Sequence, residues 1–248
     1  MDSNKVNLFD IEFDSISMEE TVELVDENIQ LDKGLHLLGV NADKINEINN
    51  NERLKKICEE AEIINADGAS VILASKLLGK PLPERVAGID LMQELLELAN
   101  KKKYPVYFIG AKNEVVSTMV KKLEKKYKNL RIAGYRDGYF KESEWPQISE
   151  QINQSGAKLV FIGITSPIKE YFIDFLLKNE SHAVLMGVGG SFDVLSGKIK
   201  RAPEWMQKSN LEWLYRVSQE PKRLFKRYFV GNTIFIGRII KEKVNAKK

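Results

Sequence analysis

Short apolar runs alternate with longer amphipathic segments along most of this chain, and this alternation limits the folds open to it. In one amphipathic segment Val115, Met119 and Leu123 share a face, from which Lys121 and Lys125 point away. The repeated order of strand and helix predicts an α/β domain, built on a mainly parallel, Rossmann-like sheet flanked by helices. The expected strands lie at residues 35–40, 62–64, 106–109, 131–135, 159–162 and 184–188.

Polar or small residues follow most of these apolar runs. In open parallel sheets, ligands bind beyond the carboxyl ends of the strands, where such loops gather. We therefore expect the functional site among the loops at 41–43, 65–68, 110–112, 135–140, 165–167 and 189–191.

Asp67 follows the apolar pair Ile63-Ile64 and precedes Gly68. This order places a carboxylate at the end of a strand, with room for a ligand beside the backbone. A general base suits that position. The alternative is that Asp67 caps the helix expected to begin near Ala69. Both interpretations remain open from the residues alone.

Two nearby features suit phosphate. Arg85 lies in a loop stiffened by Pro81 and Pro83, where a guanidinium could clamp a diphosphate, or could simply be a solvated surface charge. The turn at 187–191 offers backbone N–H groups at a helix start. It matches neither the dinucleotide fingerprint nor a P-loop, so it indicates phosphate or a nucleotide sugar only weakly.

The end of the chain is strongly basic. From Lys198 onward there are 14 Lys and Arg against 4 Asp and Glu, whereas the whole chain carries only +3. Within it, residues 221–229 would place aromatic groups on one helical face and cations on the other, a pattern typical of a helix lying on an anionic membrane. Packing of the aromatic face on the protein itself is the alternative. We predict a catalytic domain at 1–197 and a basic, membrane-associating helical appendage at 198–248.

Metal and cofactor signals are weak. Cys58 is the only cysteine, and His36 and His182 lack the spacing of a zinc site, so no metal or cofactor is expected. The least polar C-terminal run, 228–240, is shorter than the roughly 20 residues that span a bilayer. We expect a cytoplasmic protein that lies on the membrane peripherally.

Six motifs together resemble those of the WecG/TagA/CpsF glycosyltransferases, glycosyltransferase family 26. The resemblance spans about residues 10–238. Its motifs include Asn41-Ala42-Asp43-Lys44 and Asn65-Ala66-Asp67-Gly68. The others lie at 78–90, 134–140, 187–203 and 212–231.

This resemblance implies an inverting bacterial enzyme that needs no divalent metal. It would move a sugar from a UDP-sugar to a sugar on undecaprenyl diphosphate, at the inner face of the cell membrane. In the teichoic-acid branch of the family, N-acetylmannosamine is transferred to lipid-linked N-acetylglucosamine. UDP-glucose and UDP-N-acetylmannosaminuronic acid are alternative donors, for capsule or exopolysaccharide synthesis.

The same resemblance implies roles for individual residues. Asp67 would be the general base, Asn41 would lie beside the reacting sugar, and Arg85 would neutralise the departing diphosphate. The donor is expected at Gly189, Gly190, Phe192, Asp193 and Tyr135, and the lipid diphosphate and membrane at Arg216, Arg223, Lys226 and Arg227.

Two positions depart from the family pattern and should border the pocket. Gly39 stands where many relatives carry Thr, so a hydroxyl is missing and space is opened. Lys169 stands where Gln is usual, which adds a charge that could favour an acidic sugar or an extra phosphate contact. The donor sugar is therefore left open by the sequence.

Two competing functions are disfavoured. A basic arm could grip nucleic acid through its phosphates, but no nucleic-acid motif accompanies it, so no nucleic-acid partner is expected. A nicotinamide-dependent oxidoreductase would need the missing dinucleotide fingerprint. A homo-oligomer is compatible with the sequence.

Overall fold

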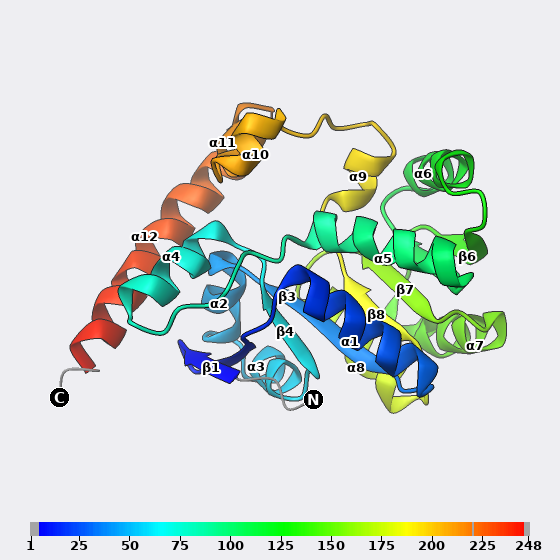
Figure 1. The fold of residues 1–248 in the computed structure, drawn as a ribbon, viewed down its shortest axis with the longest axis horizontal. Coiled ribbons are helices and arrows are strands. Elements are labelled where there is room, and N and C mark those ends of the chain that lie inside the picture. Colours follow the sequence, from blue (N-terminus) through cyan, green and yellow to red (C-terminus); the bar gives the residue numbers. More distant parts are fainter. Residues whose placement is uncertain (1–4, 220, 246–248) are drawn as a thin grey trace.

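A six-stranded parallel sheet organises the fold (Figure 1). The computed structural model describes residues 5–219 and 221–245, without the side chains of 208 and 222–228. The strand order is β4-β3-β8-β7-β5-β6. The strands are β3 (Leu35–Val40), β4 (Ile63–Ala66), β5 (Pro105–Gly110), β6 (Arg131–Arg136), β7 (Leu159–Gly163) and β8 (Val184–Gly187). All six apolar runs therefore form strands, and the predicted α/β sheet is confirmed.

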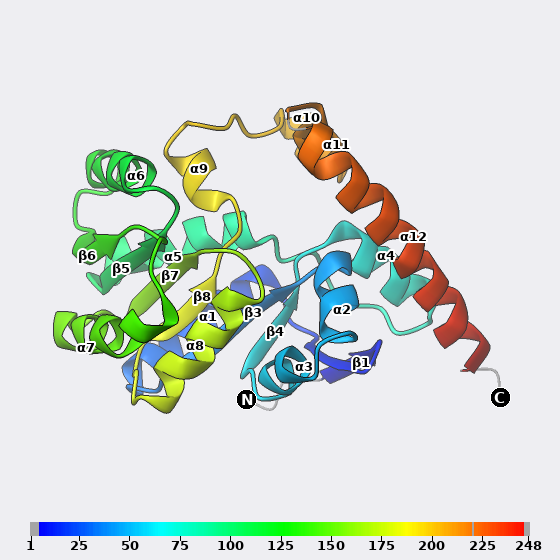
Figure 2. The same cartoon turned by 180° about the vertical axis from the view of Figure 1, so that it is seen from behind.

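Helices cover both faces of the sheet because successive strand residues point to opposite sides. In β5, Val106 and Phe108 join one buried cluster, whereas Tyr107 and Ile109 join another. The first cluster packs against α1 (Met18–Gln30), α5 (Gly88–Lys102) and α6 (Asn113–Lys126). The second packs against α7 (Trp145–Ser155), preceded by the 3-10 turn η1 (Glu142–Glu144), and α8 (Ile168–Lys178), seen from behind in Figure 2.

A third buried cluster lies at the β3–β4 edge of the sheet. It includes residues of α2 (Ala42–Ile48), α3 (Glu52–Glu59) and α4 (Ala69–Leu77). An antiparallel hairpin of β1 (Lys5–Leu8) and β2 (Ile11–Asp14) also belongs to it. The sequence did not predict this hairpin, because its turn uses Phe9 and Asp10 at φ values of 58° and 61° in place of glycine.

The described part of the C-terminal segment contains the helices α9 (Ser191–Leu195), α10 (Glu204–Lys208), α11 (Glu212–Gln219) and α12 (Pro221–Asn245). Helix α12 runs beside α2 in both Figure 1 and Figure 2. Its Phe235 is 2% exposed and lies 5.1 Å from the Phe9 ring. The predicted C-terminal helix is confirmed, and one side of it packs on the protein itself.

The other side of α12 remains apolar and open to solvent. Phe229, Ile236, Ile240 and Val244 are each more than half exposed. No helix within the described residues combines the length and the apolar character that crossing a membrane requires. The side chains of Arg223, Lys226 and Arg227, expected at the membrane, lie outside the described residues.

The chain changes direction across the sheet between β4 and β5. From β3 it moves outward to the edge strand β4, and it then crosses to β5 on the far side of β8 and β7. Such a reversal leaves a crevice at the carboxyl ends of the strands around β3 and β8. Asn41, Asp67 and the turn after β8 all lie at this end of the sheet.

Candidate active site

Asp67, directly after β4, is held by three hydrogen bonds. Its N–H donates to the Val40 carbonyl at 3.0 Å, and its own carbonyl accepts from Arg85 Nε at 2.7 Å. Its Oδ1 accepts from the N–H of Gly88, the first residue of α5, at 2.9 Å. Within the described part of the chain, Oδ2 has no hydrogen-bond partner, so one carboxylate oxygen is fixed and the other is available.

The alternative prediction, that Asp67 caps the helix beginning near Ala69, is wrong. Gly68, and not Asp67, is the N-cap of α4, and that cap has no side-chain hydrogen bond. Asp67 instead meets the N-terminus of α5, a helix that begins 21 residues further along the chain. The helix dipole favours a carboxylate there.

Asn41 and Gly39 lie close to Asp67 at the same end of the sheet. Asn41 is the N-cap of α2, where its Oδ1 accepts from the Lys44 N–H at 3.0 Å. A Cβ on Gly68 would lie 3.0 Å from the Asn41 Cβ, so the β3 and β4 loops touch. A Cβ on Gly39 would lie 3.5 Å from the Asp67 Cβ, so a side chain there would rest against the carboxylate-bearing residue.

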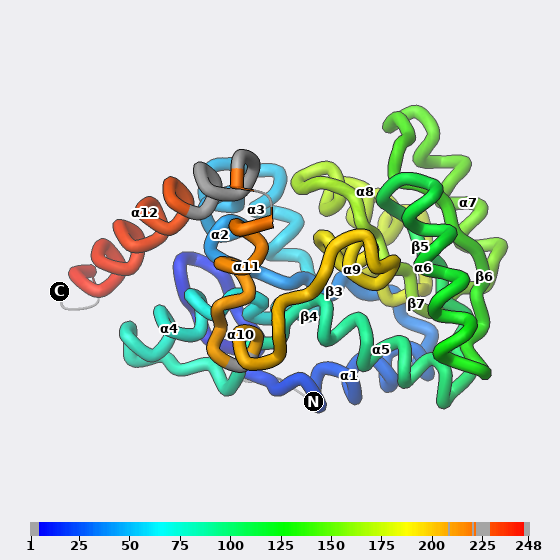
Figure 3. Tube along the Cα trace, turned by 90° about the horizontal axis from the view of Figure 1, so that it is seen from above, coloured from blue at the N-terminus to red at the C-terminus, as the bar shows by residue number. Residues whose placement is uncertain are grey.

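Arg85 connects Asp67 to the C-terminal helices. Its Nη2 lies 3.7 Å from Oε2 of Glu212, which is only 5% exposed and begins α11. Arg216 approaches the same carboxylate at 3.5 Å, so this predicted tail arginine lies close to Arg85. Figure 1 shows the chain running from α9 to α10 and α11 above this end of the sheet, and Figure 3 shows it from above.

Arg201 also approaches Glu212, and the sequence analysis assigned Arg201 no role. It makes two contacts with Asp90 in the first turn of α5, at 2.6 and 2.8 Å, and its Nε lies 3.5 Å from Glu212. The sequence pointed to Arg201 only through its place in the motif at 187–203. Asp90 and Glu212 are 111 and 11 residues away in sequence, so their pairing was not visible.

The glycine-rich turn after β8 is open where a ligand would need space. A Cβ on Gly189 or Gly190 would meet no atom within 4 Å, and both residues are exposed. Asp193 follows in α9 and pairs with Lys198 at 2.7 Å. The turn can therefore present its backbone to an anion.

Phe192 does not line this turn. It is 1% exposed and packs in the core, edge-on to Phe108 at a centroid distance of 6.0 Å. A Cβ on Gly163 would press on its ring at 3.1 Å. The predicted substrate contact at Phe192 is thus corrected to a supporting role beneath the turn.

Lys169 lies on the floor of the site above β8. A Cβ on Gly187 would fall 2.6 Å from the Lys169 Cε, so the bare glycine makes room for this side chain. Burial lowers the pKa of Lys169, although Glu170 opposes the shift. Its ammonium group is 3.5 Å from Glu170.

A buried polar network that the sequence did not reveal surrounds Glu170. Lys44 contacts Glu170 at 2.9 Å and Glu47 at 3.1 Å, and it also donates to Ser166. Burial opposes ionisation of Glu170, but Lys169 and Lys44 outweigh it and hold its pKa at about 2. The network ties the loops after β3 and β7 together beneath the candidate pocket.

Tyr135 does not join the other predicted residues. It lies on β6, the strand at the opposite edge of the sheet from β4. Five strand spacings of about 4.8 Å separate the two edges by roughly 24 Å. Tyr135 is 43% exposed and would reach only a ligand that extends across the sheet.

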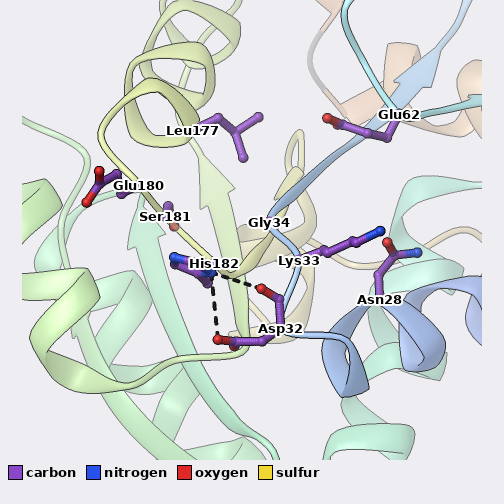
Figure 4. A pocket seen from close by; sticks show the side chains of 9 residues that line it. All are labelled: Asn28, Asp32, Lys33, Gly34, Glu62, Leu177, Glu180, Ser181 and His182. Atoms are coloured by element: carbon purple, nitrogen blue, oxygen red, sulfur yellow. Dashed lines mark hydrogen bonds and ion pairs between the residues drawn. The ribbon is translucent and has the colours of Figure 1, made fainter.

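An open cavity of about 760 Å³ lies at the opposite, amino end of the sheet (Figure 4). His182 Nδ1 approaches the Asp32 carbonyl there at 2.9 Å. Both of these side chains are more than half exposed, whereas Ser181 of the lining is only 5% exposed. Its lining consists of Asn28, Asp32, Lys33, Gly34, Glu62, Leu177, Glu180, Ser181 and His182.

Across 5–219 and 221–245, no three His, Cys, Asp or Glu side chains gather as metal ligands. The cations at the candidate site are those of lysine and arginine side chains.

Comparison with known proteins identifies similar sequences over nearly the whole length. A family model described as "Glycosyl transferase WecG/TagA/CpsF family" matches residues 6–248. An N-acetylglucosaminyldiphosphoundecaprenol N-acetyl-beta-D-mannosaminyltransferase of Bacillus spizizenii is 35% identical over 220 residues, covering 89% of this chain and 83% of the relative. A protein with the same activity in its name, from Bacillus subtilis (strain 168), is 37% identical over 191 residues, covering 77% and 73%.

Proposed function

Because this chain belongs to the WecG/TagA/CpsF glycosyltransferase family and is a glycosyltransferase, we propose that it transfers N-acetylmannosamine from a UDP-sugar to N-acetylglucosamine on undecaprenyl diphosphate. The observation that carries the proposal is the half-engaged carboxylate of Asp67 beside the guanidinium of Arg85. A base and a cation placed together are what a glycosyl transfer to an alcohol requires.

Asp67 acts as the general base. Its Oδ2 takes the proton of the acceptor hydroxyl while the hydroxyl oxygen forms a bond to the anomeric carbon of the donor. The bond from that carbon to the UDP oxygen breaks, and UDP leaves with the bonding electrons. Because the attack comes from the side opposite the leaving group, the anomeric configuration is inverted.

Fixed cations meet the charge that builds on the departing diphosphate. Arg85 and Arg216 approach Glu212 with their Nη2 atoms and hold further N–H groups that a phosphate oxygen can accept from. A single guanidinium can bind phosphate bidentately, and arginines already held in place need no reorganisation during the reaction. We therefore propose that transfer proceeds without a divalent metal.

The donor enters beyond β8. The exposed turn at Gly189 and Gly190 can donate backbone N–H groups to the UDP phosphates, while Asn41 and Gly39 border the sugar next to Asp67. Gly39 leaves space there, and Lys169 brings an amino group, 3.5 Å from the Glu170 carboxylate, to the pocket floor. This amino group makes UDP-N-acetylmannosaminuronic acid the second donor to test.

The acceptor arrives on a lipid, so the enzyme is proposed to work at the inner face of the cell membrane. The open apolar side of α12, with Phe229 and Ile236 exposed, can enter the headgroup region. Basic residues of the same helix would add attraction to anionic lipids. Docking there would bring the lipid diphosphate towards the arginine cluster.

One experiment tests the function directly. The full chain is incubated with a panel of UDP-sugars and a polyprenyl-diphosphate N-acetylglucosamine analogue, and the products are identified by mass spectrometry. We expect addition of one N-acetylhexosamine from UDP-N-acetylmannosamine, an inverted linkage by NMR, and unchanged turnover in EDTA. Absence of product with every donor refutes the proposal, and loss of turnover in EDTA refutes its metal-independent part.

A further inference from the structure

Glu212 gathers three arginines that come from distant parts of the chain. Its carboxylate is 5% exposed and lies 3.7 Å from Arg85, 3.5 Å from Arg201 and 3.5 Å from Arg216. These separations are at the long end for ion pairs, so no single arginine saturates the carboxylate. Glu212 is the shared centre of the cluster.

Two of these arginines lead to Asp67 by separate routes. Arg85 donates directly to the Asp67 carbonyl at 2.7 Å. Arg201 holds Asp90 in the first turn of α5, and the first N–H of that same helix, from Gly88, holds Asp67 Oδ1. A movement of Glu212 would therefore disturb the contacts that Asp67 makes with Arg85 and with Gly88.

Charge balance explains why the carboxylate matters. Glu212 and Asp90 supply two negative charges to the three guanidinium groups of the cluster. Without the Glu212 charge, three guanidinium groups would share a partly buried space with the single carboxylate of Asp90. Removing one partner of a buried ion pair is strongly destabilising because the remaining charges are left uncompensated. The arginines would then move apart towards solvent.

We propose that Glu212 is a positioning residue, which assembles Arg85, Arg201 and Arg216 beside Asp67 before any diphosphate arrives and holds α10 and α11 over the site. The inference rests on the proposed function, because it takes the arginines to be the groups that meet the diphosphate. Glu212 itself does not touch the reacting atoms. It fixes the place and direction of groups that do.

The test uses the full-length protein with Glu212→Gln, which keeps the size of the side chain and removes its charge. The matched control is Glu204→Gln, since Glu204 lies on α10 in the same segment but is exposed. Hydrogen exchange is followed in peptides covering 197–219, and kcat and KM are measured for the UDP-sugar. Glu212→Asp, which keeps the charge, serves as the rescue variant.

We expect Glu212→Gln to exchange faster in that segment than wild type, with the core strands unchanged. We expect kcat to fall on the order of 10- to 100-fold, which is less than the roughly 10²- to 10³-fold lost when a charge-stabilising donor is itself removed, with a smaller change in KM. Glu212→Asp should recover part of kcat, and Glu204→Gln should match wild type in both measurements. A purely structural role would lower the thermal midpoint and leave kcat of the folded protein unchanged.

The inference is overturned if Glu212→Gln keeps wild-type exchange in 197–219, or if its kcat stays within twofold of wild type. If Glu212→Gln does not fold, Arg201→Gln replaces it, because that change breaks the Asp90 contact and should give the same local exchange and kcat loss. A failure of the proposed function looks different. In that case wild type turns over no UDP-sugar, while the exchange comparison still decides whether Glu212 holds the segment.

Discussion

Replacement of Asp67 by Asn separates the proposed catalytic role of this residue from its structural one. An asparagine has the same shape, and its Oδ1 can accept the Gly88 N–H as the carboxylate does at 2.9 Å. The Arg85 contact is made to the backbone carbonyl, so it is indifferent to the side chain. Only the charge and the proton-accepting Oδ2 are lost.

The two expected magnitudes differ widely. Loss of a negative charge at the N-terminus of α5 should cost about 0.3 to 1 kcal/mol of folding free energy, which lowers the thermal midpoint by at most about 4 °C in a chain of this size. Loss of a general base should slow transfer by about 10²- to 10⁴-fold, equivalent to roughly 2.7 to 5.4 kcal/mol in the barrier. Transfer should therefore collapse while the fold survives.

The assay is single-turnover transfer with the preferred UDP-sugar, together with thermal unfolding by circular dichroism. Asp32→Asn is the control, because Asp32 lies at the opposite end of the sheet and its φ of 54° suits asparagine equally well. It should keep normal turnover. Transfer by Asp67→Asn within threefold of wild type would show that another group accepts the proton.

Three further changes test other parts of the structure. Lys169→Gln should shift the ratio of kcat/KM between neutral and acidic UDP-sugars with little change in stability; an unchanged ratio would remove Lys169 from donor selection. Burial lowers the pKa of His36 from 6.5 to about 4. As the pH falls below 6.5, His36 therefore binds a proton in the unfolded chain but stays neutral in the folded one. Stability should drop by about 1 to 2 kcal/mol between pH 6.5 and 5, and urea unfolding of His36→Leu should show a correspondingly flatter pH profile. Phe235→Ala should cost about 3 to 5 kcal/mol and increase exchange in α12, whereas the exposed Ile236→Ala should change stability by less than about 0.5 kcal/mol; equal effects would mean that α12 is not anchored through Phe235.

Side-chain partners that are distant in sequence account for most of what sequence reasoning missed at the site. The glycines and polar residues after β3, β4 and β8 were found because strand-end loops converge in any parallel sheet. Phe192 was misplaced because a short motif does not say which of its residues face inwards. The position of Tyr135 depended on strand order, since neighbouring motifs in the sequence can lie at opposite edges of a sheet.

The six strands of the sheet and the helices between them could be predicted from the residues alone, because strands covered on both faces are largely apolar and the covering helices are apolar on one side. Asp67 and Arg85 were predicted from their positions in loops, and the role of Asn41 was implied by the family resemblance. Tertiary structure alone decided that Asp67 rests on the start of α5, that α12 docks through Phe235, and that Glu212 draws three arginines together. These contacts join residues up to 226 positions apart, and local periodicity carries no signal for pairs formed only when the chain closes on itself.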